Sequence, residues 1–425
     1  MMLDKNTVII SDKNTEYTVI SLISSGTGQG DIYKVCSDGR EYAMKLFYGE
    51  DEEKLLEQIH ILMKRGKACA AYVHPLDIVR VDGRIGYIME YVPDSYLPGS
   101  ILYNGIERDG VHEELPFHIK LSLLYDLSEA VAVLYHAGLA MLDLKFDNLK
   151  VDPENCSVKI IDTDTIVSAN GKNIIEGTVG FMPPLTMLRK EVPSKYNDSY
   201  ALAVMIFMTL IGNHPLMGRA GDVPHDCDME TYLFAEHPVY VAHPTDDSNR
   251  PSPEEEHISQ KLAKYPKVFL DAMQKTFVDG LYDGEKRTTP EEWLPILRQV
   301  YELAYCCSEC GEEQFFTDHS SVVCSCCGSH IMKPLLLKGD KVIPLFLGSP
   351  VIESNVWNEN SKPREILKVV TTPYHAKCGL LVEQGKLILH FQNGRSVVFE
   401  KGKTAPLFMD AEYEYEQKTF RMEEM

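Results

Sequence analysis

Residues 142–148 read Leu-Asp-Leu-Lys-Phe-Asp-Asn, and this run decides how the rest of the chain is interpreted. It places a carboxylate at Asp143, a cation at Lys145 and an amide at Asn148. Asp143 can orient a hydroxyl group and take its proton, and Lys145 can neutralise charge on a moving phosphoryl group. Asn148 can ligate a metal ion. A polar surface loop is the structural alternative for the same residues.

A second carboxylate follows at the end of an apolar strand. Residues 159–164 read Lys-Ile-Ile-Asp-Thr-Asp, and Asp162 stands 19 positions after Asp143. A hard oxygen ligand at this position suits Mg²⁺, which bridges phosphate groups. An aspartate that caps a turn is the simpler alternative.

Two elements that precede the run favour phosphate binding. Residues 24–35 contain Gly26, Gly28 and Gly30 between two strand-like segments. Glycines there let backbone N–H groups close over phosphates without a Cβ in the way. The apolar strand Tyr-Ala-Met-Lys then ends in Lys45. A purely structural glycine hairpin and a solvent-facing lysine are the alternatives.

A buried lysine is costly unless an anion pairs with it. The natural partners of Lys45 are ligand phosphates and a carboxylate on the helix predicted at residues 51–67. We favour Glu57 for this role, with Glu53 as the second choice. Either glutamate can instead face solvent.

Taken in this order, the four elements resemble the signatures of the protein kinase family: glycine-rich loop, strand lysine, catalytic loop and metal-binding aspartate. The resemblance covers roughly residues 15–305. It implies a bilobal α+β fold with a β-rich N-lobe and a helical C-lobe. It also implies ATP as the nucleotide and Mg²⁺ (or Mn²⁺) as the metal, held by Asn148 and Asp162.

Residues 89–92, Met-Glu-Tyr-Val, resemble the hinge segment that meets adenine in this family. The resemblance makes Met89 the gatekeeper, and the Glu90 carbonyl and Val92 N–H would bond the base. Two further residues of the quoted elements are assigned to nucleotide binding, Ile32 and Ala43.

Three later segments resemble further kinase elements. Residues 177–184 resemble the end of an activation segment, residues 198–204 the buried helix that anchors the catalytic loop, and residues 287–293 the start of a late helix. The family resemblance implies Ser/Thr specificity, because Lys145 follows the catalytic aspartate by two residues and Thr178 stands where a substrate-loop threonine contacts it.

The chain departs from the family pattern at several positions. Ser25 and Thr27 replace two glycines, Met141-Leu142 replaces His-Arg, Thr163-Asp164 replaces Phe-Gly, and Leu185 replaces a glutamate, so that Arg287 lacks its family partner. Without the arginine, the usual pocket for an activation-loop phosphate is missing. We therefore expect activity that does not require loop phosphorylation.

The Ile-Asp-Thr-Asp run at 161–164, together with Gly-Gln-Gly at 28–30, resembles a divergent bacterial kinase branch. Members of that branch are often encoded near a metal-dependent phosphatase and a von Willebrand A protein. These two proteins, beside a protein substrate, are the predicted partners.

Six of the 11 cysteines crowd between Cys306 and Cys327. The pairs Cys307/Cys310 and Cys324/Cys327 have CxxC spacing and are separated by 13 residues. Four thiolates at these spacings predict a closed structural Zn²⁺ site. Cys306 or Cys326 could substitute in the register, and a redox-active dithiol is the minor alternative. We expect His319 and His330 to face solvent.

From Leu335 onward the pattern is one of short strands split by turns. Asn393-Gly394 lies between two alternating apolar runs and predicts a hairpin. We expect a small β-sandwich or barrel that docks or stabilises. A forkhead-associated-type phosphopeptide reader is the alternative for such a domain, but the tail carries no firm motif for one.

The composition restricts location and partners. The formal net charge of -21 disfavours binding to nucleic acid or to an anionic membrane surface. The apolar run at 200–212 is too short to span a bilayer, and residues 1–15 lack the apolar run of a signal peptide. With the clustered cysteines, these features predict a cytoplasmic protein.

We therefore predict three domains: a kinase-like domain at 1–305 with lobes at about 1–92 and 93–305, a zinc ribbon at 306–333, and an all-β domain at 334–425. The predicted activity is ATP-dependent Ser/Thr protein phosphorylation. A pseudokinase scaffold and a small-molecule kinase are the alternatives.

Overall fold

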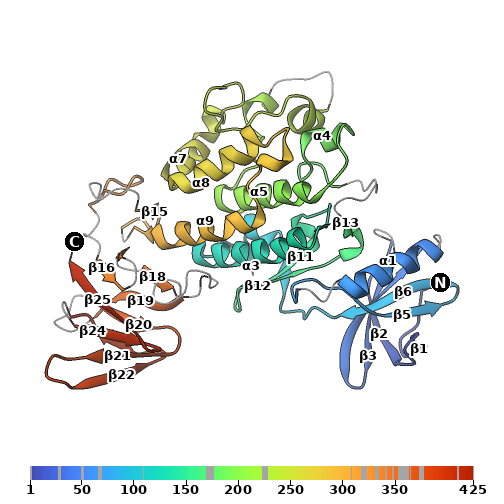
Figure 1. Ribbon diagram of the computed structural model, residues 1–425, viewed down its shortest axis with the longest axis horizontal. Helices are drawn as coiled ribbons and strands as arrows, with labels where there is room; N and C mark the ends of the chain where they lie inside the picture. The colour runs from blue at the N-terminus through green and yellow to red at the C-terminus, as the bar shows by residue number, and fades with distance from the viewer. Residues whose placement is uncertain are drawn as a thin grey trace. The chain divides into compact units, whose positions relative to one another are not determined.

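The computed structural model describes most of the chain. The described residues are 2–26, 30–48, 52–65, 69–108, 110–168, 177–222, 228–307, 309–316, 323–330, 335–339, 342–346, 349–352, 363, 365–372, 378–408 and 411–424. The chain divides into two compact units: Met1–Glu114 with Glu129–Met205, and Leu115–Ser128 with Ile206–Met425. Figure 1 shows a β-rich N-terminal region, helices in the middle of the chain and a second β-rich region at the C-terminus.

The first unit opens with a six-stranded antiparallel sheet of order β1-β2-β3-β4-β6-β5. Its strands are β1 (Val8–Ile10), β2 (Glu16–Ser24), β3 (Gly30–Ser37), β4 (Arg40–Phe47), β5 (Pro75–Val81) and β6 (Arg84–Glu90). Alternate side chains such as Val19, Val35 and Met44 build one buried cluster, as expected for strands with one face on a core.

Helix α1 (Glu52–Arg65) confirms the helix predicted at 51–67. It buries Ile59 and Leu62, and Ile59 packs in a cluster with Ile78 and Tyr87 of the sheet. The opposite face carries Glu57, which is exposed. The helix is therefore held by its apolar stripe.

Short elements complete the first unit: β7 (Leu97–Pro98), α2 (Ile101–Asn104), β8 (Ile106–Arg108), β9 (Val111–Glu113), β10 (Leu139–Ala140), β11 (Leu149–Asp152), β12 (Ser157–Ile160), β13 (Val167–Ser168) and α4 (Pro184–Met187). Strands β12, β11 and β7 form a small sheet. Two long helices, α3 (Phe117–His136) and α5 (Lys195–Ile211), have residues in both units. Helix α5 confirms the buried helix predicted at residues 198–204.

The helical part of the second unit contains α6 (Met229–Thr231), α7 (Glu256–Lys264), α8 (Lys267–Gln274) and α9 (Pro290–Leu303). Helix α9 begins with a capping box, in which the side chains of Thr289 and Glu292 each bond the other's backbone N–H. Its Trp293 is fully buried. Between α6 and α7 the chain has little regular structure apart from short helical turns.

Two antiparallel sheets form the C-terminal part of the second unit. One has the order β17-β16-β25-β24-β21-β22 and the other β18-β19-β20-β23. The strands are β16 (Leu335–Lys338), β17 (Val342–Leu345), β18 (Pro350–Ile352), β19 (Glu365–Thr371), β20 (Cys378–Val382), β21 (Lys386–His390), β22 (Ser396–Glu400), β23 (Thr404–Pro406), β24 (Glu412–Tyr415) and β25 (Lys418–Glu424).

Both sheets contribute to one buried cluster, which includes Leu337, Leu389 and Tyr413 from the first and Val369 and Leu380 from the second. This arrangement is a β-sandwich. Strands β21 and β22 pair as predicted around the Asn393-Gly394 turn, where Gly394 has a φ of 79°. A positive φ explains the glycine, because side chains disfavour that conformation.

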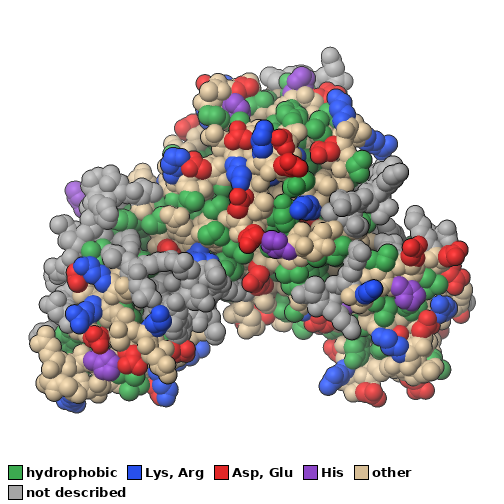
Figure 2. All heavy atoms as spheres, viewed as in Figure 1, with side chains coloured by type: hydrophobic (Ala, Val, Ile, Leu, Met, Phe, Trp, Pro, Cys, Tyr) green, Lys and Arg blue, Asp and Glu red, His purple; other side chains and the backbone are tan. Residues whose placement is uncertain are grey.

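Charged side chains of both signs are interspersed on the face shown in Figure 2. On this face, the described Lys and Arg side chains lie among Asp and Glu and do not gather into one basic surface. Among the helices that the structure describes, none combines the length and apolar character needed to cross a bilayer.

Candidate active site

The loop that carries Asp143 is fixed by hydrogen bonds to a buried aspartate on α5. Asp198 accepts hydrogen bonds from the backbone N–H groups of Met141 (2.6 Å) and Leu142 (2.9 Å). Leu142 has a left-handed φ of 64°, so the two bonds hold a strained backbone directly before Asp143. Burial raises the pKa of Asp198 to about 7, although the two bonds lower it in part. The anchoring role predicted for residues 198–204 is thus present in the geometry.

Three predicted catalytic side chains meet at the Asp143 carboxylate. Thr178 Oγ1 donates to Asp143 Oδ1 at 2.7 Å, and Lys145 Nζ lies 2.9 Å from Asp143 Oδ2. Lys145 Nζ also donates to Thr178 Oγ1 at 2.7 Å. The carboxylate is thereby fixed in one orientation with a cation beside it.

Asn148 belongs to the same network. Its Nδ2 donates to the Asp143 carbonyl at 2.9 Å and to Asp143 Oδ2 at 3.2 Å. Since the amide nitrogen is engaged on Asp143, the amide oxygen is the atom that Asn148 can offer a metal. The Asn148 carbonyl accepts from the Ile161 N–H at 2.9 Å, which ties the loop to the residue before Asp162.

Lys45 meets the segment that follows β12. Its Nζ donates to Asp162 Oδ1 at 2.7 Å and also pairs with Asp164. Burial opposes the ammonium charge, but the Asp164 and Asp162 carboxylates outweigh it and raise the pKa of Lys45. The structure thus brings together Lys45 and Asp162, the predicted strand lysine and the predicted metal ligand.

The predicted partner of Lys45 on α1 is not found. Glu57 is exposed, and the described ion pairs of Lys45 are with Asp162 and Asp164. The reason is packing: α1 turns its apolar face to the sheet, which leaves Glu57 on the outer face. Glu53, the second choice, is exposed as well.

Asp164 and Tyr87 are site residues that the sequence reasoning missed. Tyr87 OH donates to Asp164 Oδ1 at 2.6 Å, and both residues are buried. Burial, reinforced by the Asp164 carboxylate, raises the pKa of Tyr87 well above its usual value. The signal for Asp164 was its place two residues after Asp162, whereas Tyr87 carried none because an alternating strand predicts a core tyrosine there.

The predicted glycine-rich loop is described at its two ends. Gly26 has a φ of 73° and donates its N–H to Tyr48 OH at 2.8 Å, and Tyr48 in turn bonds Asp31. At the other end, a Cβ on Gly30 would lie 2.3 Å from the Leu46 carbonyl oxygen, so only glycine fits. Gly28 lies outside the described residues.

The remaining predicted nucleotide-binding residues follow the strand register. In the β3, β4 and β6 ladder, Ile32 pairs with Lys45, Lys45 with Tyr87, and Ala43 with Met89. Ile32 and Met89 are partly buried and Ala43 is buried. The predicted hinge residues mark the end of β6: Glu90 is its last residue and bonds Lys159 Nζ at 2.9 Å, and Val92 follows it.

Arg287 has acquired other partners in place of the missing glutamate. Its buried guanidinium donates to the carbonyls of Gly280 at 2.8 Å and Leu281 at 3.4 Å. Backbone carbonyls of the second unit therefore accept hydrogen bonds from this guanidinium, where the family pattern has a carboxylate.

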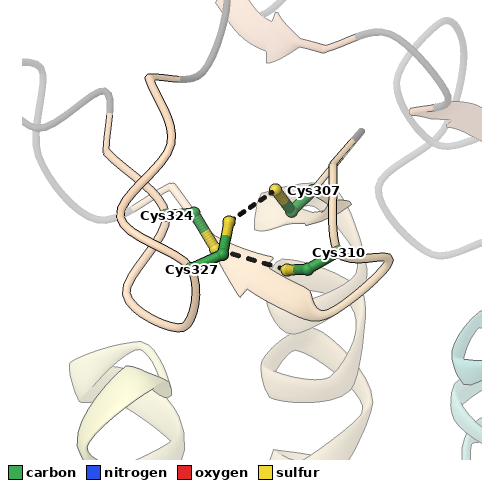
Figure 3. A group of neighbouring side chains, drawn as sticks. All are labelled: Cys307, Cys310, Cys324 and Cys327. Carbon is green, nitrogen blue, oxygen red and sulfur yellow. Dashed lines mark hydrogen bonds between the residues drawn. The ribbon is translucent and has the colours of Figure 1, made fainter.

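Four cysteines of the second unit form a separate group (Figure 3). The Sγ atoms of Cys307, Cys310, Cys324 and Cys327 lie within 4.8 Å of one another. The pairs Cys307–Cys327 and Cys310–Cys324 are 3.8 and 3.7 Å apart. A tetrahedron with Zn–S bonds of about 2.3 Å has edges of about 3.8 Å, so the group fits zinc.

Each CxxC pair is followed by a glycine that closes the turn. Gly311 and Gly328 have φ values of 74° and 70°, and their N–H groups bond the carbonyls of Cys307 and Cys324. Cys306 and Cys326, the alternatives for the register, are exposed and stand outside the group of four. His330 is exposed as predicted, and His319 lies outside the described residues.

Comparison with known proteins identifies the family of this chain. The protein kinase domain family matches residues 17–294. The serine/threonine-protein kinase oca2 of Schizosaccharomyces pombe is 29% identical over 212 residues, which are 46% of this chain and 30% of that protein. A probable cAMP-dependent protein kinase catalytic subunit of Encephalitozoon cuniculi is 25% identical over 206 residues, 47% of this chain and 60% of that protein.

This chain therefore spans less than two thirds of the length of either relative. Among solved structures, the Cydia pomonella granulovirus kinase PK-1 is similar with a TM-score of 0.45 and 16% identity, covering 65% of this chain and 91% of that one. Because the family match extends over more than half of the 425 residues, the chain belongs to the protein kinase family.

Proposed function

We propose that this chain is an active Ser/Thr protein kinase that transfers the γ-phosphoryl group of ATP to a protein hydroxyl. The observation that carries the proposal is the arrangement at Asp143, whose carboxylate is flanked by Lys145 Nζ and Thr178 Oγ1 and braced by Asn148. Family membership and the Ser/Thr kinases among its relatives support the same activity.

The chain's own side chains divide the work. Asp143 orients the acceptor hydroxyl and receives its proton, while Lys145 neutralises charge that develops on the phosphoryl group. Lys45 holds the nucleotide phosphates, and the glycine-rich loop with Gly26, Gly28 and Gly30 is the proposed cover over them.

Asn148 and Asp162 would hold the metal. Both offer oxygen atoms, which Mg²⁺ prefers, and the Asp162 side chain is 45% exposed and so open to a ligand. Bound there, Mg²⁺ would neutralise the phosphate oxygens. Ile32, Ala43, Met89, Glu90 and Val92 stay the proposed contacts to the base.

The chain's departures bear on regulation. Met141 and Leu142 stand in place of His-Arg, and their N–H groups bond Asp198, so the loop is fixed without a phosphate-binding arginine. We therefore propose that the activity does not require phosphorylation of the activation loop. The three-domain division remains part of the proposal: α9 ends at Leu303 and β16 begins at Leu335, near the proposed boundaries at 305 and 334.

Zinc in the cysteine group is proposed as a structural staple, and the β-sandwich as a docking or stabilising domain. A cytoplasmic location, membership in the divergent bacterial branch, and partnership with a metal-dependent phosphatase and a von Willebrand A protein remain predictions. The relatives named above are eukaryotic, so they do not address the bacterial branch.

Two other activities compete with this proposal. A pseudokinase would bind nucleotide without transfer, and Thr163-Asp164 in place of Phe-Gly motivates that view. A small-molecule kinase would use the same site on a metabolite. The segment 177–184, which resembles the end of a protein kinase activation segment and carries Thr178, favours a protein substrate.

The test measures radiolabelled phosphate transfer from ATP with Mg²⁺ to protein, with phosphoamino-acid analysis of the product. Asp143→Ala is expected to lower the rate by roughly 10²–10⁴-fold. Asp147→Ala, an exposed aspartate in the same loop, is the matched control and should keep the wild-type rate. Equal background incorporation by wild type and Asp143→Ala would end the kinase proposal, and label on metabolites alone would redirect it.

A further inference from the structure

The anchoring of Lys45 differs from the arrangement that the family resemblance implies. The ammonium meets two carboxylates that both come from the short segment after β12, Asp162 and Asp164. The rest of the environment decides which of the two stays with the lysine when a nucleotide and a metal are bound.

Exposure separates the two carboxylates. The side chain of Asp162 is 45% exposed, whereas that of Asp164 is 7% exposed. A metal ligand must reach the nucleotide, which suits Asp162. Asp164 lies in the interior, where a charge persists only beside a partner of opposite charge. Once a metal engages Asp162, Asp164 is the carboxylate that remains with Lys45.

Asp164 is itself held on both sides. Tyr87, directly across from Lys45 in the β4–β6 pair, donates its hydroxyl to Asp164 Oδ1 at 2.6 Å. The preceding residue, Thr163, is buried and bonds the Val73 carbonyl at 2.9 Å through its hydroxyl. Asp164 therefore bonds two side chains from neighbouring strands, Lys45 on β4 and Tyr87 on β6.

Helix α1 offers no equivalent within the part of it that the structure describes. Glu57 and Glu53 are both exposed, and the face toward the sheet is apolar. A long flexible lysine side chain gains a defined position only from a fixed partner. That partner here is Asp164.

We propose that Asp164, supported by Tyr87, is the residue that positions Lys45 for the nucleotide phosphates, in place of a glutamate on α1. The inference rests on the proposed function, since it concerns the same site. It makes Asp164 a positioning residue, because it acts through Lys45. The position of the Lys45 side chain then depends on the segment 163–165 and not on the position of α1.

The test compares Asp164→Asn, Glu57→Gln, Lys45→Met and the double variant Lys45→Met/Asp164→Asn in the full chain. The readouts are kcat and KM for ATP and the affinity for a fluorescent ATP analogue with Mg²⁺. Asp164→Asn keeps the shape of the side chain and is expected to lower kcat/KM for ATP on the order of 10²-fold, because a misplaced catalytic group costs that much.

The double variant decides whether Asp164 acts through Lys45. If it does, Asp164→Asn adds no loss to that of Lys45→Met, whereas independent roles would multiply the two losses. A purely structural aspartate would lower the melting temperature in both backgrounds and leave the KM for ATP unchanged. Tyr87→Phe, which removes only the hydroxyl, is the second variant, and a smaller loss of the same kind is expected from it.

The inference is overturned if Glu57→Gln carries the loss and Asp164→Asn keeps the wild-type kcat/KM. It is also overturned if the losses of Lys45→Met and Asp164→Asn multiply. Failure of the proposed function looks different: the wild type would bind the analogue without transferring phosphate. In that case the same variants, read by analogue affinity, still decide whether Asp164 positions Lys45, and a wild type that binds no nucleotide would overturn both.

Discussion

Replacing Asp198 with alanine should destabilise the unit that carries the catalytic loop and slow phosphate transfer. The carboxylate accepts the N–H groups of Met141 at 2.6 Å and Leu142 at 2.9 Å, and all three residues are buried. Alanine leaves both N–H groups without an acceptor. An unsatisfied buried donor costs about 1–3 kcal/mol, so the two together cost about 2–6 kcal/mol.

The consequence for activity follows from the backbone of Leu142. Its left-handed φ of 64° is held by the lost bond, and a conformation of this kind costs about 1–3 kcal/mol unless its surroundings enforce it. Released, the backbone can relax and carry Asp143 away from Lys145 and Thr178. We therefore expect kcat to fall together with stability, with a smaller change in KM for ATP.

Thermal unfolding of the full chain, followed beside phosphate transfer, measures both effects. A loss of about 2–6 kcal/mol lowers the melting temperature of a domain of this size by about 5 °C or more. The matched control is Ser199→Ala on the same helix. Within the described residues the buried Ser199 hydroxyl has no hydrogen-bond partner, so its removal should change little. An Asp198→Ala variant whose melting temperature lies within about 1 °C of that of wild type would refute the reasoning.

The same residue predicts a dependence on pH. Since burial raises the pKa of Asp198 to about 7 from its usual 3.8, the native state keeps a proton there that the unfolded chain has released. This contribution to stability is complete below the unfolded pKa and is lost as pH rises toward about 7. The stability difference between wild type and Asp198→Ala should thus be larger at pH 5 than at pH 8, and a difference independent of pH would contradict the assigned cause.

Two further predictions concern the glycine-rich loop and the cysteine group. Gly30→Ala puts a Cβ 2.3 Å from the Leu46 carbonyl oxygen, so we expect it to cost about 1–3 kcal/mol and to raise the KM for ATP. Gly39→Ala is the control for destabilisation alone, because its φ of 73° strains an alanine although the Cβ meets nothing within 4 Å, and it should leave the KM unchanged; an unchanged KM in Gly30→Ala would contradict this. Chelation or Cys310→Ser should release one zinc per chain and lower the melting temperature, while the exposed Cys326→Ser keeps its metal; equal zinc content in both variants would argue against the assigned register.

Much of the site was predictable because it is local in sequence. Asp143, Lys145 and Asn148 lie within six residues, and the short turn between them brings their side chains into contact. The CxxC pairs behave alike, since each grips one edge of a tetrahedron through a single turn. The hairpin at Asn393-Gly394 was equally local.

Partner choice across long sequence distances was not predictable. Lys45 lies 117 residues from Asp162 and 119 from Asp164, and no local pattern ranks these carboxylates against Glu57. The order of strands in the β-sandwich is another case. Alternating strands show which face is buried, but the pairing of β16 with β25 depends on the whole set of strands.

The sequence by itself determined which chemical groups this protein kinase carries and which short elements hold them, because helix periodicity, strand alternation and turn residues act within a few positions. The tertiary structure alone decided that Asp164 and Tyr87, not Glu57, surround Lys45, and that Asp198 fixes the backbone directly before Asp143. The physical reason is desolvation: a buried charge keeps the partner that packing places beside it, and only the folded chain fixes that choice.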